Sequence, residues 1–309
     1  MLANFLGKSK PINFIILLGL FICLFLFSSF SLFLNHSFEL SLLMKIASSL
    51  GLYLVIFFFF NFIVSKNNLT FDNSYAYFIF TIILSYFLPI VTNPKTLVVL
   101  LLYILFLRKI YSLKSQKQPL QKLFDSGFWL SILYILEPFS AMFAVLIYSA
   151  IFLHQKIIVN NLIAPIVGFL TPITLYFTYC FWFDKLYIFT NLFYFEDFNS
   201  FFYYSEKSIY WISILIVIFS VISIFLKSPK TLSVNNSFKK SWILLMINLV
   251  ITLLFAFLVP NKNGTELLFF LFPSAIIMAN GLETVNKNLI KNIVFTLLFI
   301  SAFIFPFLL

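Results

Sequence analysis

Glu137 is the residue of this sequence whose position is best suited to chemistry. It stands before Pro138 inside an apolar stretch, in the pentapeptide YILEP (Tyr134–Pro138). A carboxylate in such a stretch usually faces a cavity or a partner, because an ionised group is expensive to place in hydrocarbon. The alternative interpretation is an ordinary turn, in which Glu137 caps the helix that begins at Pro138 and contacts only water.

A second candidate is an aromatic segment that carries two acids. Eight of the twelve residues of Phe193–Tyr204 are aromatic, and Glu196 and Asp197 stand among them. Rings with a polar edge favour the level of the lipid headgroups. The segment therefore predicts a helix that lies in the interface and borders a groove for a lipid chain or a glycan. An aromatic belt without a ligand is the alternative.

Motifs for nucleotide, metal or serine-hydrolase chemistry are absent from the sequence. There is no Walker loop, no GxGxxG, no HExxH and no GxSxG. The chain has two histidines, His36 and His154, and two cysteines that stand in apolar runs. These are too few for a haem or a histidine-ligated metal. We therefore expect neither a metal site nor a cofactor.

Membrane helices are the elements that must position these residues. Of the 309 residues, 62% are hydrophobic and 10% are charged, whereas an ordinary soluble domain has about 25% charged residues. A soluble fold of this size cannot hide so much apolar surface, because much of it must face water. Disorder requires the opposite composition. The composition thus predicts a polytopic membrane protein.

Eleven apolar stretches match the length of a membrane crossing, if short and broken helices are included. Glu137 and Pro138 divide one long stretch, Phe124–Leu153, into two short limbs. We predict an all-α transmembrane helical bundle that forms one integral membrane domain over residues 1–309. The other nine crossings are expected at Ile12–Leu34, Leu42–Val64, Ser74–Val91, Thr96–Leu107, Ile163–Phe183, Ile209–Leu226, Trp242–Val259, Leu267–Leu282 and Ile293–Leu309.

The distribution of charge predicts the orientation. With the amino terminus inside, 15 of the 20 basic residues fall on inner segments and seven of the ten acids fall on outer ones. The inner acids Asp72, Asp125 and Glu283 stand among lysines that would neutralise them. The largest inner loop, Arg108–Lys122, sets the orientation; binding of anionic headgroups is its alternative role. The net charge of +10 therefore needs no nucleic-acid partner.

Four stretches of the sequence resemble an uncharacterised family of polytopic bacterial inner-membrane proteins. They are MLANFLGKSKPINF (Met1–Phe14), NNLTFDNSYAYFIF (Asn67–Phe80), LRKIYSLKSQKQPLQKLFDSGFWLSILYILEPFS (Leu107–Ser140) and GFLTPITLYFTYCFWFDKLY (Gly168–Tyr187). The resemblance spans most of the chain. It implies the bacterial inner membrane as the location, with a cytoplasmic amino terminus and a periplasmic carboxyl terminus from the charge distribution, and it implies no activity.

The sequence is more distantly similar to membrane glycosyltransferases that use polyprenyl-phosphate sugars. The matching positions are Glu39, in NHSFELS (Asn35–Ser41), and the broken stretch Phe124–Leu153. This resemblance implies that Glu39 takes a proton from the acceptor hydroxyl at the outer face, while Glu137 helps to position the acceptor. The residues that would bind the substrate, its phosphate or its lipid are His36, Glu196, Asp197, Tyr203, Tyr204 and Lys207.

Three functions stay open at this point. The first is a transferase that acts on a lipid-linked sugar at the outer membrane face. The second is a non-catalytic scaffold or assembly partner, and the third is a transporter of a lipid or a solute. Their expected partners are membrane lipids, a polyprenyl-phosphate-linked glycan, and another membrane protein.

Overall fold

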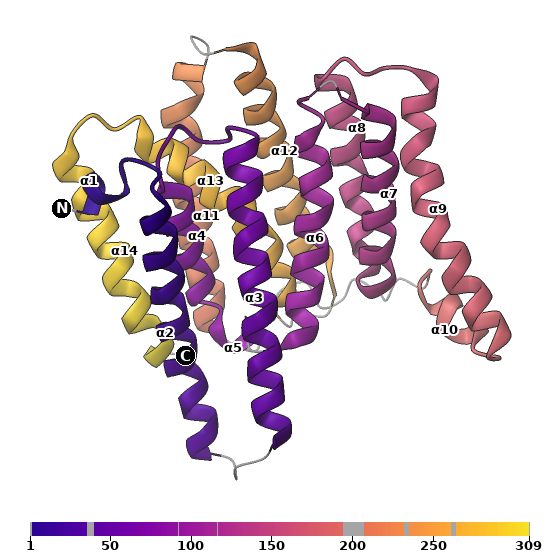
Figure 1. Ribbon diagram of the computed structural model, residues 1–309, viewed down its shortest axis with the longest axis horizontal. Helices are drawn as coiled ribbons and strands as arrows, with labels where there is room; N and C mark the ends of the chain where they lie inside the picture. The colour runs from indigo at the N-terminus through magenta and orange to yellow at the C-terminus, as the bar shows by residue number, and fades with distance from the viewer. Residues whose placement is uncertain are drawn as a thin grey trace. The chain divides into compact units, whose positions relative to one another are not determined.

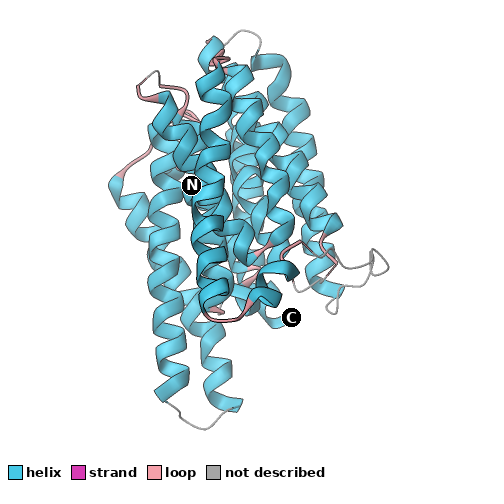
Figure 2. Ribbon diagram, turned by 90° about the vertical axis from the view of Figure 1, so that its right-hand side faces the viewer, coloured by secondary structure: helices cyan, strands magenta, loops and turns pink. Residues whose placement is uncertain are grey.

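The computed structural model consists of helices and the loops between them (Figure 2). It describes residues 2–35, 40–91, 93–115, 117–193, 207–231, 235–260 and 264–308. Over these residues it has fourteen α-helices, two 3-10 helices and no strand. The predicted all-α fold is confirmed.

Most of the helices begin and end close to the predicted spans (Figure 1). They are α1 (Leu2–Leu6), α2 (Pro11–Asn35), α3 (Leu40–Lys66), α4 (Tyr75–Ser85), α5 (Leu88–Val91), α6 (Pro94–Ser112), α7 (Pro119–Leu136), η1 (Pro138–Phe143), α8 (Ala144–Leu153), α9 (Val159–Trp182), α10 (Leu186–Asn191), α11 (Lys207–Thr231), α12 (Asn236–Leu258), η2 (Thr265–Leu267), α13 (Leu268–Glu283) and α14 (Asn288–Leu308).

Seven stretches of helix in the described residues are long and apolar enough to cross a membrane. They are Pro11–Ser29, Leu40–Lys66, Val159–Trp182, Ile209–Thr231, Asn236–Leu258, Thr265–Glu283 and Asn288–Phe305. Two shorter apolar helices, Tyr75–Ser85 and Pro138–Leu153, accompany them. These helices indicate a polytopic membrane protein, while the number of eleven crossings stays a prediction.

The chain divides into two compact units. Unit 1 contains Met1–Val98, Tyr204–Lys239 and Asn263–Leu309, and unit 2 contains Val99–Tyr203 and Lys240–Lys262. The single membrane domain over residues 1–309 therefore stays a prediction.

Unit 1 is built around helix α13, which other helices enclose. All fifteen residues from Leu268 to Leu282 are buried, and α13 packs against α4 and α11. At Gly281 an added Cβ atom would lie 2.4 Å from the Cβ atom of Ser223, so α11 and α13 approach closely there. A helix that is apolar all round belongs inside a bundle.

Stacked aromatic rings join α2, α3 and α4 of unit 1. The ring centroids of Phe21 and Tyr53 are 3.5 Å apart, and those of Phe60 and Phe80 are 4.0 Å apart. Rings packed in this way bury large apolar surfaces. Much of the phenylalanine in the composition thus serves helix packing.

Unit 2 centres on the contact between α7 and α9. An added Cβ atom at Gly127 would lie 2.0 Å from the Pro165 carbonyl oxygen, and one at Gly168 would lie 2.1 Å from the Phe124 carbonyl oxygen. Small residues let two membrane helices approach until their backbones touch. This contact holds α7 in place up to its end at Leu136.

The helix break predicted at Glu137 and Pro138 is confirmed. Helix α7 ends at Leu136, Glu137 is extended with φ −138° and ψ 90°, and the 3-10 helix η1 begins at Pro138. Proline has no backbone N–H to continue the α-helical pattern, and it favours an extended residue before it.

Candidate functional site

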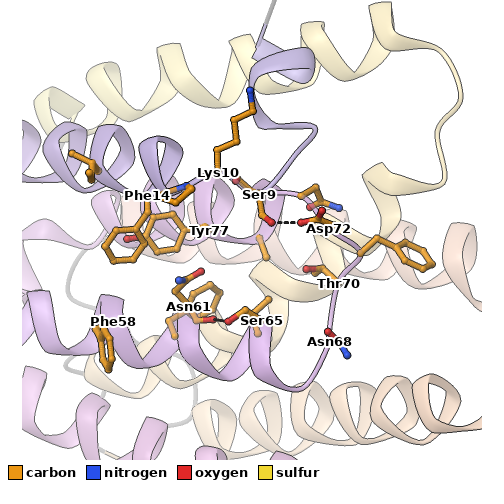
Figure 3. Close-up of a pocket in the computed structure, with 18 residues that line it drawn as sticks. Ser9, Lys10, Phe14, Phe58, Asn61, Ser65, Asn68, Thr70, Asp72 and Tyr77 are labelled. Atoms are coloured by element: carbon orange, nitrogen blue, oxygen red, sulfur yellow. Dashed lines mark hydrogen bonds between the residues drawn. The ribbon is translucent and has the colours of Figure 1, made fainter.

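A pocket with a volume of about 740 Å³ lies in unit 1 beside the ends of three elements. Its lining comes from the start of α2, the last two turns of α3, the loop of residues 67–74 and the start of α4 (Figure 3). The pocket therefore opens where one end of the helices meets the connecting loops.

The lining of the pocket has a polar and an aromatic part (Figure 3). The polar part, which we call the rim, contains Ser9, Lys10, Asn61, Ser65, Thr70 and Asp72, and Ser9 donates a hydrogen bond to Asp72. The aromatic part contains Phe14, Phe58 and Tyr77, with the rings of Phe14 and Tyr77 stacked at 4.8 Å. Such a lining is amphipathic and fits a ligand with a polar and an apolar end.

The Tyr77 hydroxyl is a buried hydrogen-bonding group beside the pocket. Tyr77 lines the pocket and is 5% exposed, and its hydroxyl has no hydrogen-bond partner among the described residues. A buried hydroxyl without a partner costs free energy, and the cost is highest away from water. A ligand oxygen that reached this hydroxyl would remove the penalty.

Glu283 holds the loop that forms one side of the rim. Its Oε1 atom accepts a hydrogen bond from the Phe71 backbone N–H at 2.9 Å and another from Asn73 Nδ2 at 2.6 Å. The loop begins after α3, where Asn68 has a left-handed backbone with φ 47°. Hydrogen bonds from Leu69 N–H to the Val64 carbonyl and from Asn68 N–H to the Ser65 carbonyl complete a Schellman motif there.

Lys227 neutralises Glu283 in a buried ion pair. The Lys227 Nζ atom lies 2.9 Å from Glu283 Oε2, and the two side chains are 3% and 6% exposed. The ammonium group also lies over the rings of Phe71, at 4.4 Å, and Phe238, at 5.2 Å. Buried charges need such pairing and hydrogen bonding to be tolerated. The rim is therefore preorganised before any ligand arrives.

Two of the three acids that were predicted to be on the inner side form ion pairs with lysines, as expected. Glu283 pairs with Lys227, and Asp125 lies 2.6 Å from Lys109 in unit 2. Asp72 differs, because the bond that the structure describes for its carboxylate comes from the Ser9 hydroxyl. Asp72 thus places an acidic group on the pocket rim.

Glu137 is a predicted site residue within the described part of the chain. It is half-buried and follows the last residue of α7. Its backbone N–H donates to the Leu133 carbonyl, and its own carbonyl accepts from the Ser140 N–H. Among the described contacts, its side chain makes no capping hydrogen bond to η1. Glu137 thus occupies the N-cap position of the Pro138 helix, as the alternative states, but without a side-chain capping bond.

The stretch that contains Glu137 lies beside the start of the aromatic segment. The Tyr134 hydroxyl donates a hydrogen bond to the Leu192 carbonyl at 3.0 Å, and the rings of Tyr134 and Phe193 are 6.4 Å apart. Both contacts lie within unit 2. The broken helix and Phe193 are thus brought together, as an outer groove would require.

Most of the other predicted site residues lie outside the described part of the chain. These are His36, Glu39, Glu196, Asp197, Tyr203 and Tyr204. Lys207 begins helix α11, but its side chain is not among those described. Over the described residues, no group of three or more His, Cys, Asp or Glu side chains could hold a metal ion.

Sequence reasoning missed the residues that organise the pocket. Lys227 and Glu283 are 56 residues apart, so no local pattern joins them. Glu266 is also buried, at 1% exposure, in η2 at the other end of α13 from Glu283. The useful signal was the polar loop NNLTFDNS (Asn67–Ser74), which follows a span and carries more hydrogen-bonding groups than a simple connection needs.

Comparison with known proteins identifies the family of the chain but assigns no activity to it. No curated protein and no solved structure matches the chain. The profile of a family described as "Family of unknown function (DUF6427)" matches residues 1–308. Because this match covers nearly the whole sequence, the chain belongs to that family of unknown function.

Proposed function

We propose that the protein is a polytopic membrane protein that binds an amphiphilic lipid in the pocket of unit 1. The observation that carries the proposal is the amphipathic lining of a cavity of about 740 Å³. The polar headgroup would contact Ser9, Lys10 and Asp72, and a hydrocarbon chain would lie against Phe14 and Phe58. Tyr77 would donate a hydrogen bond to an oxygen near the junction of headgroup and chain.

The position of the pocket supports a headgroup at the cytoplasmic face. Lys8, Lys10, Lys66 and Lys227 belong to the pocket end of unit 1. The positive-inside rule places such an end in the cytoplasm. Lys10 then gives the rim a cation for an anionic headgroup, and Asp72 accepts hydrogen bonds from its hydroxyl groups.

Lipid extraction and mass spectrometry of the purified protein test this proposal. Ile15 and Ser65 line the pocket and are exposed, so tryptophan at both positions fills the cavity without disturbing the core. Ile16 and Ser48 are exposed on the same two helices and line no part of the pocket. We expect the variant I15W/S65W to lose several-fold of the bound lipid and the control I16W/S48W to retain it. Equal lipid in the two variants would contradict the proposal.

A pair of tyrosines tests the hydrogen bond. Tyr53 and Tyr77 both have buried hydroxyls with no partner among the described residues, but only Tyr77 lines the pocket. Y77F should weaken lipid binding, whereas Y53F should leave it unchanged. A decrease of the same size in both variants would assign the effect to packing.

A second candidate function is transfer of a sugar from a polyprenyl-phosphate donor at the outer face. The contact between Tyr134 and Leu192, which brings the broken helix to the aromatic segment, supports it. Glu39 would be the base, Glu137 would position the acceptor, and His36, Glu196, Asp197, Tyr203, Tyr204 and Lys207 would bind the substrate. E137Q and E39Q should then abolish incorporation of labelled sugar into membrane glycan. Unchanged incorporation in both variants would leave a scaffold or a lipid or solute transporter as the alternatives.

A further inference from the structure

Four titratable side chains converge at one end of unit 2. They are Lys114, which follows α6; His154 and Lys156, which follow α8; and Lys240, in the second turn of α12. All four are half-buried, whereas Lys117, in the same loop as Lys114, is exposed. These lysines therefore do not simply project into solvent.

Burial and the three lysines act on His154 in the same direction. Burial, and after it the charges of Lys240, Lys156 and Lys114, together lower the pKa of His154 to about 4. Burial also lowers the pKa of Lys114. His154 is consequently neutral near pH 7 and offers one hydrogen-bond donor among three ammonium groups.

The backbone fixes two members of the cluster. Helix α8 ends in a Schellman motif, with Gln155 in the left-handed region at φ 55°. The Lys156 N–H donates to the Ile151 carbonyl, and the Gln155 N–H donates to the Phe152 carbonyl. Asn161 Nδ2 then donates to the Lys156 carbonyl at 2.9 Å. His154 and Lys156 are held on a rigid turn.

The described acids of unit 2 do not neutralise this end. Asp125 is engaged by Lys109 at 2.6 Å, and Glu137 and Asp184 follow the opposite ends of α7 and α9. Neither Lys156 nor Lys240 takes part in an ion pair within the described ranges of the chain. Half-buried lysines are therefore concentrated at this end of unit 2, and no described carboxylate forms an ion pair with Lys156 or Lys240.

We propose that Lys114, Lys156, Lys240 and His154 form a binding site for a phosphate-bearing anion. Ammonium groups bind phosphate oxygens as point charges, and three of them at one place more than offset the charge of about −1.5 to −2 that a phosphate group carries near pH 7. The His154 imidazole adds a directed hydrogen bond. This site lies in unit 2, is independent of the lipid pocket in unit 1, and can be tested without it.

The phosphate can come from two sources, an anionic lipid headgroup or a soluble phosphate compound. The wild-type protein in a non-ionic detergent is titrated with inorganic phosphate, and the same protein is placed in nanodiscs of phosphatidylcholine with or without phosphatidylglycerol. The readout is the pKa of His154 from NMR of ¹³C-labelled histidine, assigned with the variant H36Q. A phosphate near the imidazole should raise this pKa by about one unit or more, because an opposite charge stabilises the protonated form.

Two double variants remove the same amount of charge from different places. K156Q/K240Q takes two lysines from the cluster, and K117Q/K287Q takes two exposed lysines from outside it. The rise in the His154 pKa should disappear in the first variant and persist in the second. A response to phosphatidylglycerol alone identifies a lipid headgroup, and a response to inorganic phosphate identifies a soluble ligand. No rise in wild-type protein in either arm, or the same rise in both double variants, overturns the proposal.

Discussion

Lys227 and Glu283 form a buried ion pair, 2.9 Å from Nζ to Oε2, that joins α11 to α13. The same carboxylate holds the backbone of Phe71 and the side chain of Asn73. One acid therefore connects two membrane helices to the loop that forms the rim of the pocket. The shape of the rim depends on residues that do not line it.

Breaking this ion pair should destabilise the protein strongly. K227M leaves the Glu283 carboxylate buried without its cation, which should lower the free energy of unfolding by about 3 kcal/mol or more. The control is D125N, which breaks the Lys109–Asp125 pair, whose side chains are 25% and 26% exposed. Partly exposed pairs contribute about 1 kcal/mol or less. Thermal unfolding in detergent measures both variants, and equal shifts in Tm would contradict the assigned difference.

The contact between α7 and α9 should tolerate no side chain at its glycines. G127A and G168A each place a Cβ atom against a backbone carbonyl, at 2.0 and 2.1 Å. Such overpacking should cost about 1 to 3 kcal/mol. Gly19 and Gly51 have no atom within 4 Å of an added Cβ, so G19A and G51A should be neutral or slightly stabilising through helix propensity. Thermal unfolding measures the Tm of the four variants. A Tm for G127A and G168A that is as high as that for G19A and G51A would contradict this packing.

The protein should lose stability on mild acidification because of His154. Its pKa in the folded state is about 4, below the ordinary value of about 6.5. The unfolded chain therefore binds the proton first, and stability falls as the pH drops from about 6.5 to about 4. Because solvent screens a partly exposed group, the expected loss is about 1 to 2 kcal/mol. H154Q should flatten this part of the Tm–pH profile, while H36Q should retain it; two identical profiles would contradict the assignment.

The orientation can be measured within unit 2. Cysteines are introduced singly at Ser115, which follows α6, and at Lys185, which follows α9, after Cys23 and Cys180 are replaced by serine. With the amino terminus inside, an impermeant maleimide should label S115C only in opened membranes and K185C in intact cells. Labelling of both from one side, or in the reverse order, would show that the predicted orientation is wrong.

The sequence predicted the features that depend on local chemistry. The spans follow from apolar length, and the break at Pro138 follows from the missing backbone donor. These two inferences need no knowledge of which helices touch. The sequence also predicted that lysines neutralise Asp125 and Glu283, but not that the partner of Glu283 is Lys227, 56 residues away.

The pocket was not predictable, because it depends on contacts between distant segments. Ser9 and Asp72 are 63 residues apart, and Phe71 and Glu283 are 212 residues apart. Tyr77 stands in an apolar run, where the sequence does not distinguish it from an aromatic residue that serves only packing. Acids beside prolines and aromatic clusters can be recognised in a sequence, whereas the role of a short polar loop depends on the helices around it.

Photo-crosslinking of a lipid in the membrane tests the central claim most directly. The protein is placed in nanodiscs that contain a phospholipid with a diazirine in its acyl chain, and the labelled peptides are mapped by mass spectrometry after illumination. The amphipathic pocket predicts adducts on Phe14, Phe58 or Tyr77, and their strong reduction in I15W/S65W but not in I16W/S48W. Adducts spread over exposed apolar residues such as Phe225 and Leu175, with none enriched in the pocket, would contradict lipid binding at this site.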